Sequence, residues 1–324
     1  MLPRERVIEV LKRGKPDRIP VYSWVRINLE KQITEKWGSV ENFEDKYEFD
    51  LSHIFGRVYP YSPDLLKEIR AKNNGVIEPE ILLDYPQNDP NDMSQYKEII
   101  EGIQYYKNTK GRFVYIQTPG IFECLNGPFG IENHLSYLLL YEDSLQEVYR
   151  RQAQWNRNFA MNCIDLGIDM VHVSDDWGMQ NNLMFSPEIW WKLIYPNHKI
   201  TCDAVKKRGT YVSLHCDGNC NDVLDGVIKL GYDVLHPYQE SAGMNYPVYK
   251  QKYAGSFIIM GGLCVQTTIG FNKRDFLEKE IRRILDMFAK DKHFIYCTTH
   301  FIQNHCSMEE LEFAYNMIHD YVRR

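Results

Sequence analysis

Short apolar runs alternate with helical patterns along almost the whole chain of 324 residues. Eight of these runs have the length and the β-branched composition of strands that are covered on both faces. They are residues 18–24, 50–55, 113–118, 170–174, 210–215, 234–237, 257–260 and 294–298. Helices are predicted at residues 3–12, 143–166, 187–207, 273–289 and 308–322, the last with Ser307 and Glu310 as a capping box. Eight strand–helix units in one chain predict an α/β fold of the (β/α)8 TIM barrel class.

A proline-rich stretch lies between the second and third predicted strands. Residues 56–112 contain five prolines and carry no comparable strand pattern. We interpret this stretch as an insertion over the mouth of the barrel. The prediction is therefore a single domain spanning residues 1–324, with residues 56–112 as a capping segment.

Charge and hydropathy exclude several classes of partner. The formal net charge of −6 makes a nucleic acid or an anionic membrane an unfavourable partner. No run of eighteen apolar residues occurs, and the charged N-terminal segment lacks the apolar core of a signal peptide. We therefore expect a cytoplasmic protein with no membrane or nucleic-acid partner, in which the eight cysteines are thiols.

The carboxyl ends of five predicted strands carry polar residues. In a barrel of this class these ends meet at one rim, where the chemistry of such proteins is located. The segments are Ser174–Gly178, His215–Asn219, His236–Glu240, Gly261–Cys264 and Thr298–His300. Any one of them alone is more simply a helix cap or a loop acid. Together they predict a polar pocket.

The stretch VSLHCDGNC contains the most reactive combination of side chains. Strand alternation places His215 and Asp217 on one side and Cys216 on the other. With His300 from the last strand they would supply three ligands to a divalent metal and leave a fourth position open. An equally simple reading makes His215 and Asp217 a metal-free acid–base pair. His305 and Cys306 are alternative ligands if the register of the last strand differs.

Neighbouring side chains have both functional and structural interpretations. Asp175 and Asp176 could bind substrate or orient a metal ligand, or they could cap the following turn. Phe122, Trp177 and Tyr238 could line an apolar pocket, although core packing is the simpler role for any one of them.

Five ordered blocks resemble the uroporphyrinogen decarboxylase superfamily, and more closely its cobamide-dependent methyltransferase branch. The blocks are RERVIEVLKRGKPDRIPV, DDWGMQNNLMFSPEIWWKLIYP, KKRGTYVSLHCDGN, MGGLCVQTTIG and TTHFIQNHCSMEEL. The true decarboxylases carry an arginine-rich signature after the first strand. This chain has VYSWVRINLEKQ there, with Arg26 as its one arginine, and Trp24 is similar to the methyltransferase type. Too few cations remain to bind a substrate with eight carboxylates.

The resemblance also implies a zinc site. The methyltransferases bind zinc through a His-x-Cys pair at the fifth strand and a cysteine after the eighth. Here His215 matches the histidine, Asp217 stands in place of the first cysteine and His300 in place of the last. Nitrogen and oxygen ligands leave zinc more Lewis-acidic than thiolates do. Glu240 is a candidate fourth ligand or proton donor.

These observations lead to three hypotheses about function. The first is a zinc-dependent methyltransferase that moves a methyl group between a small O-, N- or S-methyl compound and a corrinoid protein. The second is a decarboxylase-like lyase that acts on a carboxylated substrate, and the third is a non-catalytic corrinoid- or tetrapyrrole-binding protein. Glu240, Asp175 and Asp176 are the candidate catalytic residues. The candidate substrate-binding residues are Trp24, Arg26, Trp177, Tyr238 and Gln239, and a homodimer is left open.

Overall fold

The computed structural model describes residues 1–323, which form two compact units. Unit 1 contains Met1–Ser52, Tyr105–Val114 and Asp233–Arg324, and unit 2 contains His53–Gln104 and Tyr115–Tyr232. The prediction of a single domain over residues 1–324 stays a prediction.

Seven strands form within the described residues, in the order β1 to β7 along the chain. They are β1 (Leu51–Ile54), β2 (Phe113–Pro119), β3 (Met170–Ser174), β4 (Tyr211–His215), β5 (Val234–His236), β6 (Ile258–Leu263) and β7 (Ile295–Thr298). In unit 2, β3 pairs in parallel with β2 and with β4, and in unit 1, β6 pairs in parallel with β5 and with β7. Parallel strands in chain order with helices between them define the TIM barrel topology, so the predicted fold class is confirmed.

The first predicted strand, residues 18–24, does not form as a strand. Only Val21 makes a bridge, with Tyr296 of β7, and this bridge is parallel. Tyr22 N–H donates to the Tyr296 carbonyl, while Asp50 N–H donates to the Val21 carbonyl, both at 2.9 Å. The segment therefore lies in unit 1 between β7 and the residue before β1, which is the position of the missing eighth strand.

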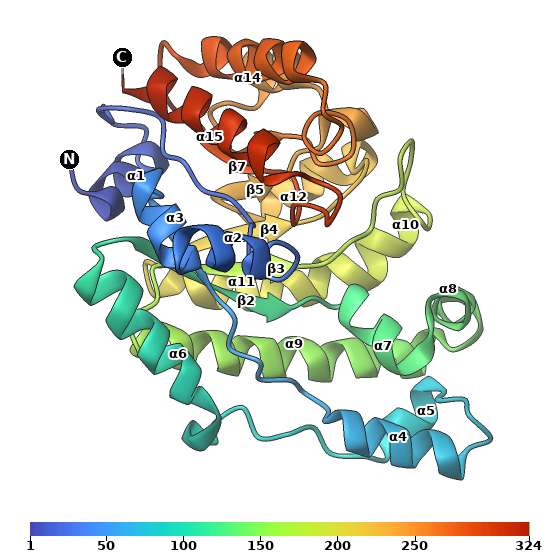
Figure 1. Cartoon of the computed structure of the whole chain (residues 1–324). Coiled ribbons are helices and arrows are strands. Elements are labelled where there is room, and N and C mark those ends of the chain that lie inside the picture. Colours follow the sequence, from blue (N-terminus) through green and yellow to red (C-terminus); the bar gives the residue numbers. More distant parts are fainter. Residues whose placement is uncertain (324) are drawn as a thin grey trace. The chain divides into compact units, whose positions relative to one another are not determined.

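Unit 2 is built on two long helices that lie against each other (Figure 1). These are α9 (Glu142–Asp165) and α11 (Tyr195–Lys207), and α9 follows α8 (Ile131–Leu140) and α7 (Asn126–Phe129). The predicted helix over residues 187–207 is divided into α10 (Pro187–Ile189), the π-helix η4 (Trp190–Ile194) and α11. Two shorter elements, η5 (Asn221–Val223) and α12 (Leu224–Leu230), complete the unit.

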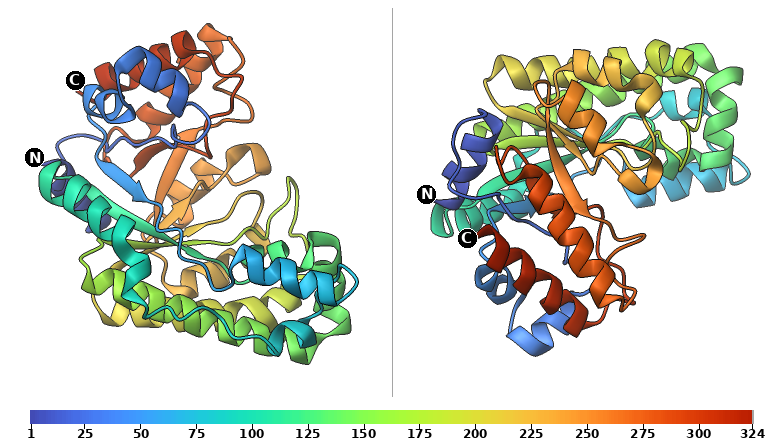
Figure 2. Two further views of the ribbon diagram at one scale, coloured as in Figure 1. Left: turned by 60° about the horizontal axis from the view of Figure 1, so that its bottom comes forward. Right: turned by 90° about the horizontal axis from the view of Figure 1, so that it is seen from above.

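Unit 1 contains the helices at both ends of the chain. Its last two helices, α14 (Arg274–Phe288) and α15 (Met308–Val322), lie side by side (Figure 2). Ser307 caps α15 as predicted, since its Oγ accepts from Glu310 N–H at 3.2 Å, whereas Glu310 Oε1 accepts from Asn272 N–H instead. The remaining helices are α1 (Pro3–Leu11), α2 (Glu30–Trp37), α3 (Val40–Lys46), η6 (Glu240–Ala242) and α13 (Tyr246–Lys252). None of the described helices is long and apolar enough to cross a membrane.

The proline-rich stretch 56–112 is largely helical. It contains α4 (Pro63–Lys72), α5 (Pro79–Leu83), η1 (Met93–Tyr96), α6 (Lys97–Gly102) and the π-helix η2 (Ile103–Thr109). Ser62 and Asp92 cap two of these elements, and α5 packs on α9 within unit 2. The position of this segment over the barrel mouth stays a prediction.

A buried carboxylate holds together the N-terminal part of unit 1. Asp50 has no exposed surface and contacts the guanidinium of Arg6 in α1. Its Oδ2 also accepts from Arg18 Nη1 at 2.7 Å and from Val21 N–H at 2.8 Å. One residue thus connects α1, the segment 18–24 and the start of β1. Because two buried arginines face it, the Asp50 carboxylate also compensates their positive charge.

We predict that Asp50→Ala lowers the free energy of unfolding by about 3–5 kcal/mol, because it leaves buried arginine charge without compensation. Urea denaturation measures this change. Asp320→Ala is the control, since the Asp320 side chain is 75% exposed and should change stability little. A loss for Asp50→Ala no larger than for this control would contradict the assigned role.

Candidate metal and acid-base site

The loops that follow β3 and β4 are joined by backbone hydrogen bonds in unit 2. Asp175 N–H donates to the His215 carbonyl at 2.9 Å, and Asn219 N–H donates to the Met179 carbonyl at 2.8 Å. Gly178 and Gly218 meet between these bonds, and a Cβ on Gly178 would lie 2.6 Å from the Asp217 carbonyl oxygen. Gly218 also has a φ of +81°. The two loops can approach this closely only because both positions are glycine.

This approach brings together three of the predicted site residues. His215 Nε2 lies 3.8 Å from Asp217 Oδ1 and 3.9 Å from Asp176 Oδ1. Asp176 Oδ1 also accepts from Asp217 N–H at 2.7 Å, which fixes the Asp217 backbone. His215 is buried, whereas about a third of the Asp217 side chain is exposed (32%). The pair His215 and Asp217 therefore lies at the edge of the unit, where a small ligand can reach it.

The carboxylate of Asp217 is not fully satisfied by hydrogen bonds. Its Oδ1 is buried, yet it has no hydrogen-bond partner within residues 1–323. Burial raises the pKa of Asp217 to about 6, and the charge of Asp176 adds to this effect while His215 opposes it. A buried carboxylate oxygen without a partner is costly unless a cation or a proton binds to it. These residues therefore fit a divalent metal ion held by nitrogen and oxygen ligands.

Cys216 is oriented away from this pair, as the alternation predicted. Its Sγ accepts from Trp177 N–H at 3.4 Å and lies 3.6 Å from the Asp217 carbonyl oxygen. Burial raises the pKa of the Cys216 thiol strongly, and Cys220 contributes to the same shift. A thiol that resists ionisation is a poor metal ligand.

His300 lies in unit 1, directly after β7, and is partly exposed. Its ring packs edge-on against Trp24, with the ring centroids 5.8 Å apart. The Trp24 ring also packs against His236 and Phe301, and the Trp24 backbone N–H donates to Thr298 Oγ1 at 3.0 Å. Trp24 therefore orients the imidazole of His300. The role of His300 as third metal ligand stays a prediction from the sequence.

Asp175 is completely buried and accepts four hydrogen bonds. The donors are Phe122 N–H, Glu123 N–H, Trp177 Nε1–H and His198 Nε2, at 3.2, 2.6, 2.8 and 2.7 Å. Burial alone would raise the pKa of Asp175, but the hydrogen bond and charge of His198 lower it overall. Because protein donors occupy the hydrogen-bonding positions of its carboxylate, Asp175 orients the residues around it. Its predicted catalytic role has no support in this geometry.

Trp177 and Phe122 pack in the core, which is the simpler of the two roles predicted for them. Trp177 is fully buried and packs against Trp190 and His198, with ring centroids 5.3 and 5.0 Å apart. Phe122 is also fully buried and stacks on His134 at 4.6 Å. Neither ring exposes a surface to a pocket.

Glu123 is a site residue that the sequence interpretation missed. It follows β2, its Oε2 accepts from Ser174 Oγ at 3.0 Å, and burial together with the charge of Asp176 raises its pKa to about 7. Its sequence signal was its position after the third predicted strand, in TPGIFEC, whose only charged residue it is. A carboxyl group with a pKa near neutrality beside two other acids is typical of functional sites.

The sequence matches a known family. The profile described as uroporphyrinogen decarboxylase (URO-D) matches residues 125–321, which is more than half of the chain. The chain belongs to the uroporphyrinogen decarboxylase family. The family prediction is thereby confirmed, and the matched region contains Asp175, Asp176, His215, Asp217 and His300.

One solved structure supports the fold of this URO-D family member. A methyltransferase from Methanosarcina mazei is similar, with a TM-score of 0.67, 12% identity and 99% coverage of both chains. A GH113 β-1,4-mannanase (TM-score 0.48, 10% identity, 94% of this chain and 98% of that chain) is more distant. So is a sugar phosphate isomerase/epimerase from Parabacteroides distasonis (TM-score 0.45, 12% identity, 94% of this chain and 96% of that chain). No curated protein sequence matches the chain.

Arg26, the one arginine in the segment where the decarboxylases carry their signature, is held in an ion-pair network of unit 1. Its Nη2 lies 2.9 Å from Glu41 Oε1 and 3.0 Å from Glu44 Oε1, and it donates to the Tyr106 hydroxyl at 2.9 Å. A role of Arg26 in binding a substrate carboxylate would require these pairs to break, and it stays a prediction.

Three other predicted residues follow β5 in unit 1. Glu240 forms an ion pair with Arg283 at 2.6 Å, and Gln239 Nε2 donates to Ser241 Oγ at 3.0 Å. Tyr238 has a φ of +52° and packs among Tyr246, Tyr249 and Phe257. The catalytic role of Glu240 and the substrate-binding roles of Tyr238 and Gln239 stay predictions.

The alternative ligands His305 and Cys306 lie in the loop before α15. His305 is exposed and contacts Phe271, with ring centroids 5.6 Å apart. Cys306 is buried, and burial raises the pKa of its thiol to about 12. This environment favours the protonated thiol over a metal-binding thiolate.

We predict that Gly178→Ala destabilises the protein by about 1–3 kcal/mol, because the new methyl group separates the loops after β3 and β4. Gly127→Ala is the control, since nothing lies within 4 Å of a Cβ at that position. Urea denaturation of both variants measures the difference. Equal stability of the two variants would show that the loops do not approach as described.

Glu123 leads to a prediction about pH. Its pKa is raised from 4.5 to about 7, so the folded state binds the proton more tightly than the unfolded state. Below pH 4.5 both states are protonated and Glu123→Gln should match the unmutated protein. As the pH rises from 4.5 to 7, the carboxyl group ionises in the unfolded state while the folded state keeps its proton, so only the unmutated protein loses stability. Above pH 7 the variant should be relatively more stable by up to about 3 kcal/mol.

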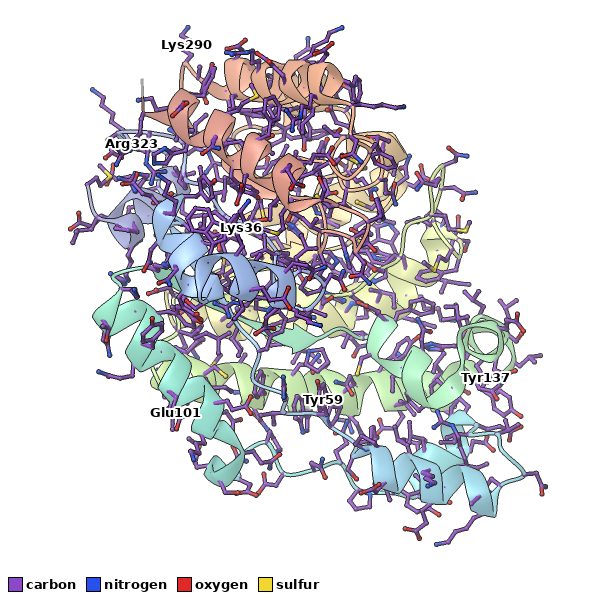
Figure 3. All side chains as sticks on the ribbon, in the orientation of Figure 1. Lys36, Tyr59, Glu101, Tyr137, Lys290 and Arg323 are labelled. Carbon is purple, nitrogen blue, oxygen red and sulfur yellow. The ribbon has the colours of Figure 1, made fainter. Side chains whose placement is uncertain are left out.

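Urea denaturation at pH 4.5 and pH 8, with a chelator present, tests this expectation. The control is Glu101→Gln in unit 2, where the Glu101 side chain, labelled in Figure 3, is 66% exposed. A stability difference for Glu123→Gln that does not change with pH would contradict the raised pKa.

Proposed function

We propose that the protein is a zinc-dependent methyltransferase that moves a methyl group between a small O-, N- or S-methyl compound and a corrinoid protein. The observation that carries this proposal is the buried Asp217 Oδ1, without a partner in residues 1–323, beside His215 Nε2. Membership of the URO-D family and the similarity to a methyltransferase support the class. A cytoplasmic location and a corrinoid carried by a partner protein are part of the same proposal.

In this proposal His215, Asp217 and His300 hold one zinc ion. Zinc, when bound, polarises the heteroatom that carries the methyl group and makes that heteroatom a better leaving group. Asp217 replaces a thiolate with a harder oxygen ligand, which suits the polarisation of an ether or amine. Asp176 keeps Asp217 in place through its backbone N–H, and Trp24 packs against the imidazole of His300. Both contacts reduce the reorganisation that binding requires.

The other side chains have supporting roles in this proposal. Asp175 fixes the backbone of Glu123, and Cys216 remains a protonated thiol that does not compete for the metal. Gln239, Tyr238 and Arg26 are proposed to contact the substrate. Glu240, as fourth ligand or proton donor, would have to leave Arg283.

The second candidate is a decarboxylase-like lyase, which the name of the matching family favours. This reaction needs cations that grip the substrate carboxylates. Arg26 is engaged by Glu41 and Glu44, and no lysine or arginine within residues 1–323 forms an ion pair with Glu123, Asp176 or Asp217. A rim dominated by carboxylates repels a polycarboxylate, so we place this candidate second.

We predict one zinc ion per chain in protein purified with zinc. His215→Ala, Asp217→Ala and His300→Ala should each weaken zinc binding by more than about 100-fold, since outer-shell residues alone are worth about 10–100-fold. Cys216→Ala is the matched control and should keep its zinc, because its sulfur faces Trp177. Elemental analysis and competition with a chromogenic chelator measure the stoichiometry and the affinity.

Two outcomes would contradict the metal site. Loss of zinc in Cys216→Ala with retention in Asp217→Ala would reverse the assignment of the ligands. Absence of zinc from the unmutated protein would favour the metal-free acid–base pair.

Formation of methylcobalamin from cob(I)alamin and a panel of methyl donors tests the reaction itself, and turnover of uroporphyrinogen would favour the lyase. A corrinoid that binds without turnover would favour the non-catalytic alternative.

A further inference from the structure

Glu123 is the first residue of the 3-10 helix η3 (Glu123–Leu125), and hydrogen bonds fix the backbone at this point. Its N–H donates to Asp175 Oδ1 at 2.6 Å, and the N–H of Phe122 donates to the same carboxylate at 3.2 Å. The Phe122 ring stacks on His134, with an interplanar angle of 21°. His134 is fixed in turn, because Nδ1 lies 2.7 Å from Asn126 Oδ1 and Nε2 lies 2.8 Å from the Tyr149 hydroxyl. The backbone of Glu123 is thus anchored by its own N–H and through Phe122.

The carboxyl group of Glu123 has little to satisfy it within the protein. Of its two oxygens, Oε2 accepts from Ser174 Oγ at 3.0 Å, and this is its one side-chain hydrogen bond to residues 1–323. The side chains that interact with it electrostatically are Asp176, His215 and Asp175, with the Cys124 thiol beside it. None of its hydrogen bonds involves His215 or Asp217. A rigidly placed acid with spare hydrogen-bonding capacity next to a metal site is suited to act on a ligand.

We propose that Glu123 is the proton donor to the heteroatom that leaves when the methyl group is transferred. This role rests on the proposed methyltransferase function. The bond between the methyl carbon and the heteroatom breaks, and its electron pair stays on the heteroatom. The cobalt(I) centre of the corrinoid supplies the pair for the new carbon–cobalt bond. The carboxyl proton of Glu123 passes to the heteroatom, and solvent then reprotonates the carboxylate.

The surroundings of Glu123 fit this role. Burial and the charge of Asp176 raise the pKa of its carboxyl to about 7, so a large fraction carries a proton at neutral pH. General acids work best when their pKa lies near the working pH. Asp175 is a positioning residue in this scheme, since it holds the Glu123 backbone and stays ionised through His198. Glu240 is a weaker candidate, because its carboxylate is already engaged in an ion pair with Arg283.

The test compares donors whose leaving groups do and do not need a proton. An aryl methyl ether releases an anionic phenolate, whereas trimethylsulfonium releases neutral dimethyl sulfide. We expect Glu123→Gln to lose about 100-fold or more in methyl transfer from the ether to cob(I)alamin, the usual contribution of a general acid. Transfer from trimethylsulfonium should change less than about threefold, and zinc content should not change.

The pH profile gives a second readout. In the unmutated enzyme, kcat for the ether should fall above pH 7, and kcat for trimethylsulfonium should not fall there. Glu132→Gln, at an exposed site nine residues further on, is the matched control and should behave as the unmutated enzyme with both donors.

Three results would overturn the proposal. Full activity of Glu123→Gln with the ether would show that no proton comes from this residue. Equal losses with both donors would show a merely structural role. Absence of transfer from either donor by the unmutated, zinc-loaded enzyme would overturn the methyltransferase function, and this role with it.

Discussion

The buried carboxylate of Asp175 is the interaction on which the geometry of the site in unit 2 depends. It joins three segments, because its hydrogen-bond donors come from the loop after β2, the loop after β3 and helix α11. His198 extends the connection to Tyr232, whose hydroxyl lies 2.7 Å from Nδ1. Gly120 allows this packing, since a Cβ there would lie 2.4 Å from Asp175 Oδ1. A buried charge with four hydrogen bonds is stable, but it becomes costly when one partner is removed.

Around this anchor the protein concentrates negative charge. Glu123, Asp176 and Asp217 lie near one another in unit 2, with the imidazole of His215 beside them. Burial and the charge of Asp176 raise the pKa of Glu123 and of Asp217, which destabilises the ionised metal-free site. A divalent cation would relieve this repulsion and bind the Oδ1 of Asp217 that lacks a protein partner. The same electrostatic cost would account for both the proposed metal binding and the proposed proton donor.

The cations of unit 1 serve a different purpose. Arg6 and Arg18 compensate the buried Asp50, and Arg26 and Arg112 compensate Glu44. These pairs stabilise the segment that replaces the eighth strand and the helix α3 that follows it. A family member that binds a polycarboxylate needs arginines free for its substrate. Here Arg26, the one arginine of the segment VYSWVRINLEKQ, forms ion pairs with Glu41 and Glu44 instead.

The sequence by itself determined the fold class and part of the site. Seven of the eight predicted strands form within three residues of their expected ends, because apolar β-branched runs between glycines and prolines specify buried parallel strands locally. The alternation of side chains along a strand also predicted that His215 and Cys216 point in opposite directions. The tertiary structure decided the rest. Residues 18–24 are held by Asp50 and Tyr296, far away in the sequence, so their own pattern could not reveal a single bridge instead of a strand. Glu123 became a site residue, and Asp175 a buried anchor, only because folding brings the ends of β2, β3 and β4 together and excludes water from their carboxylates.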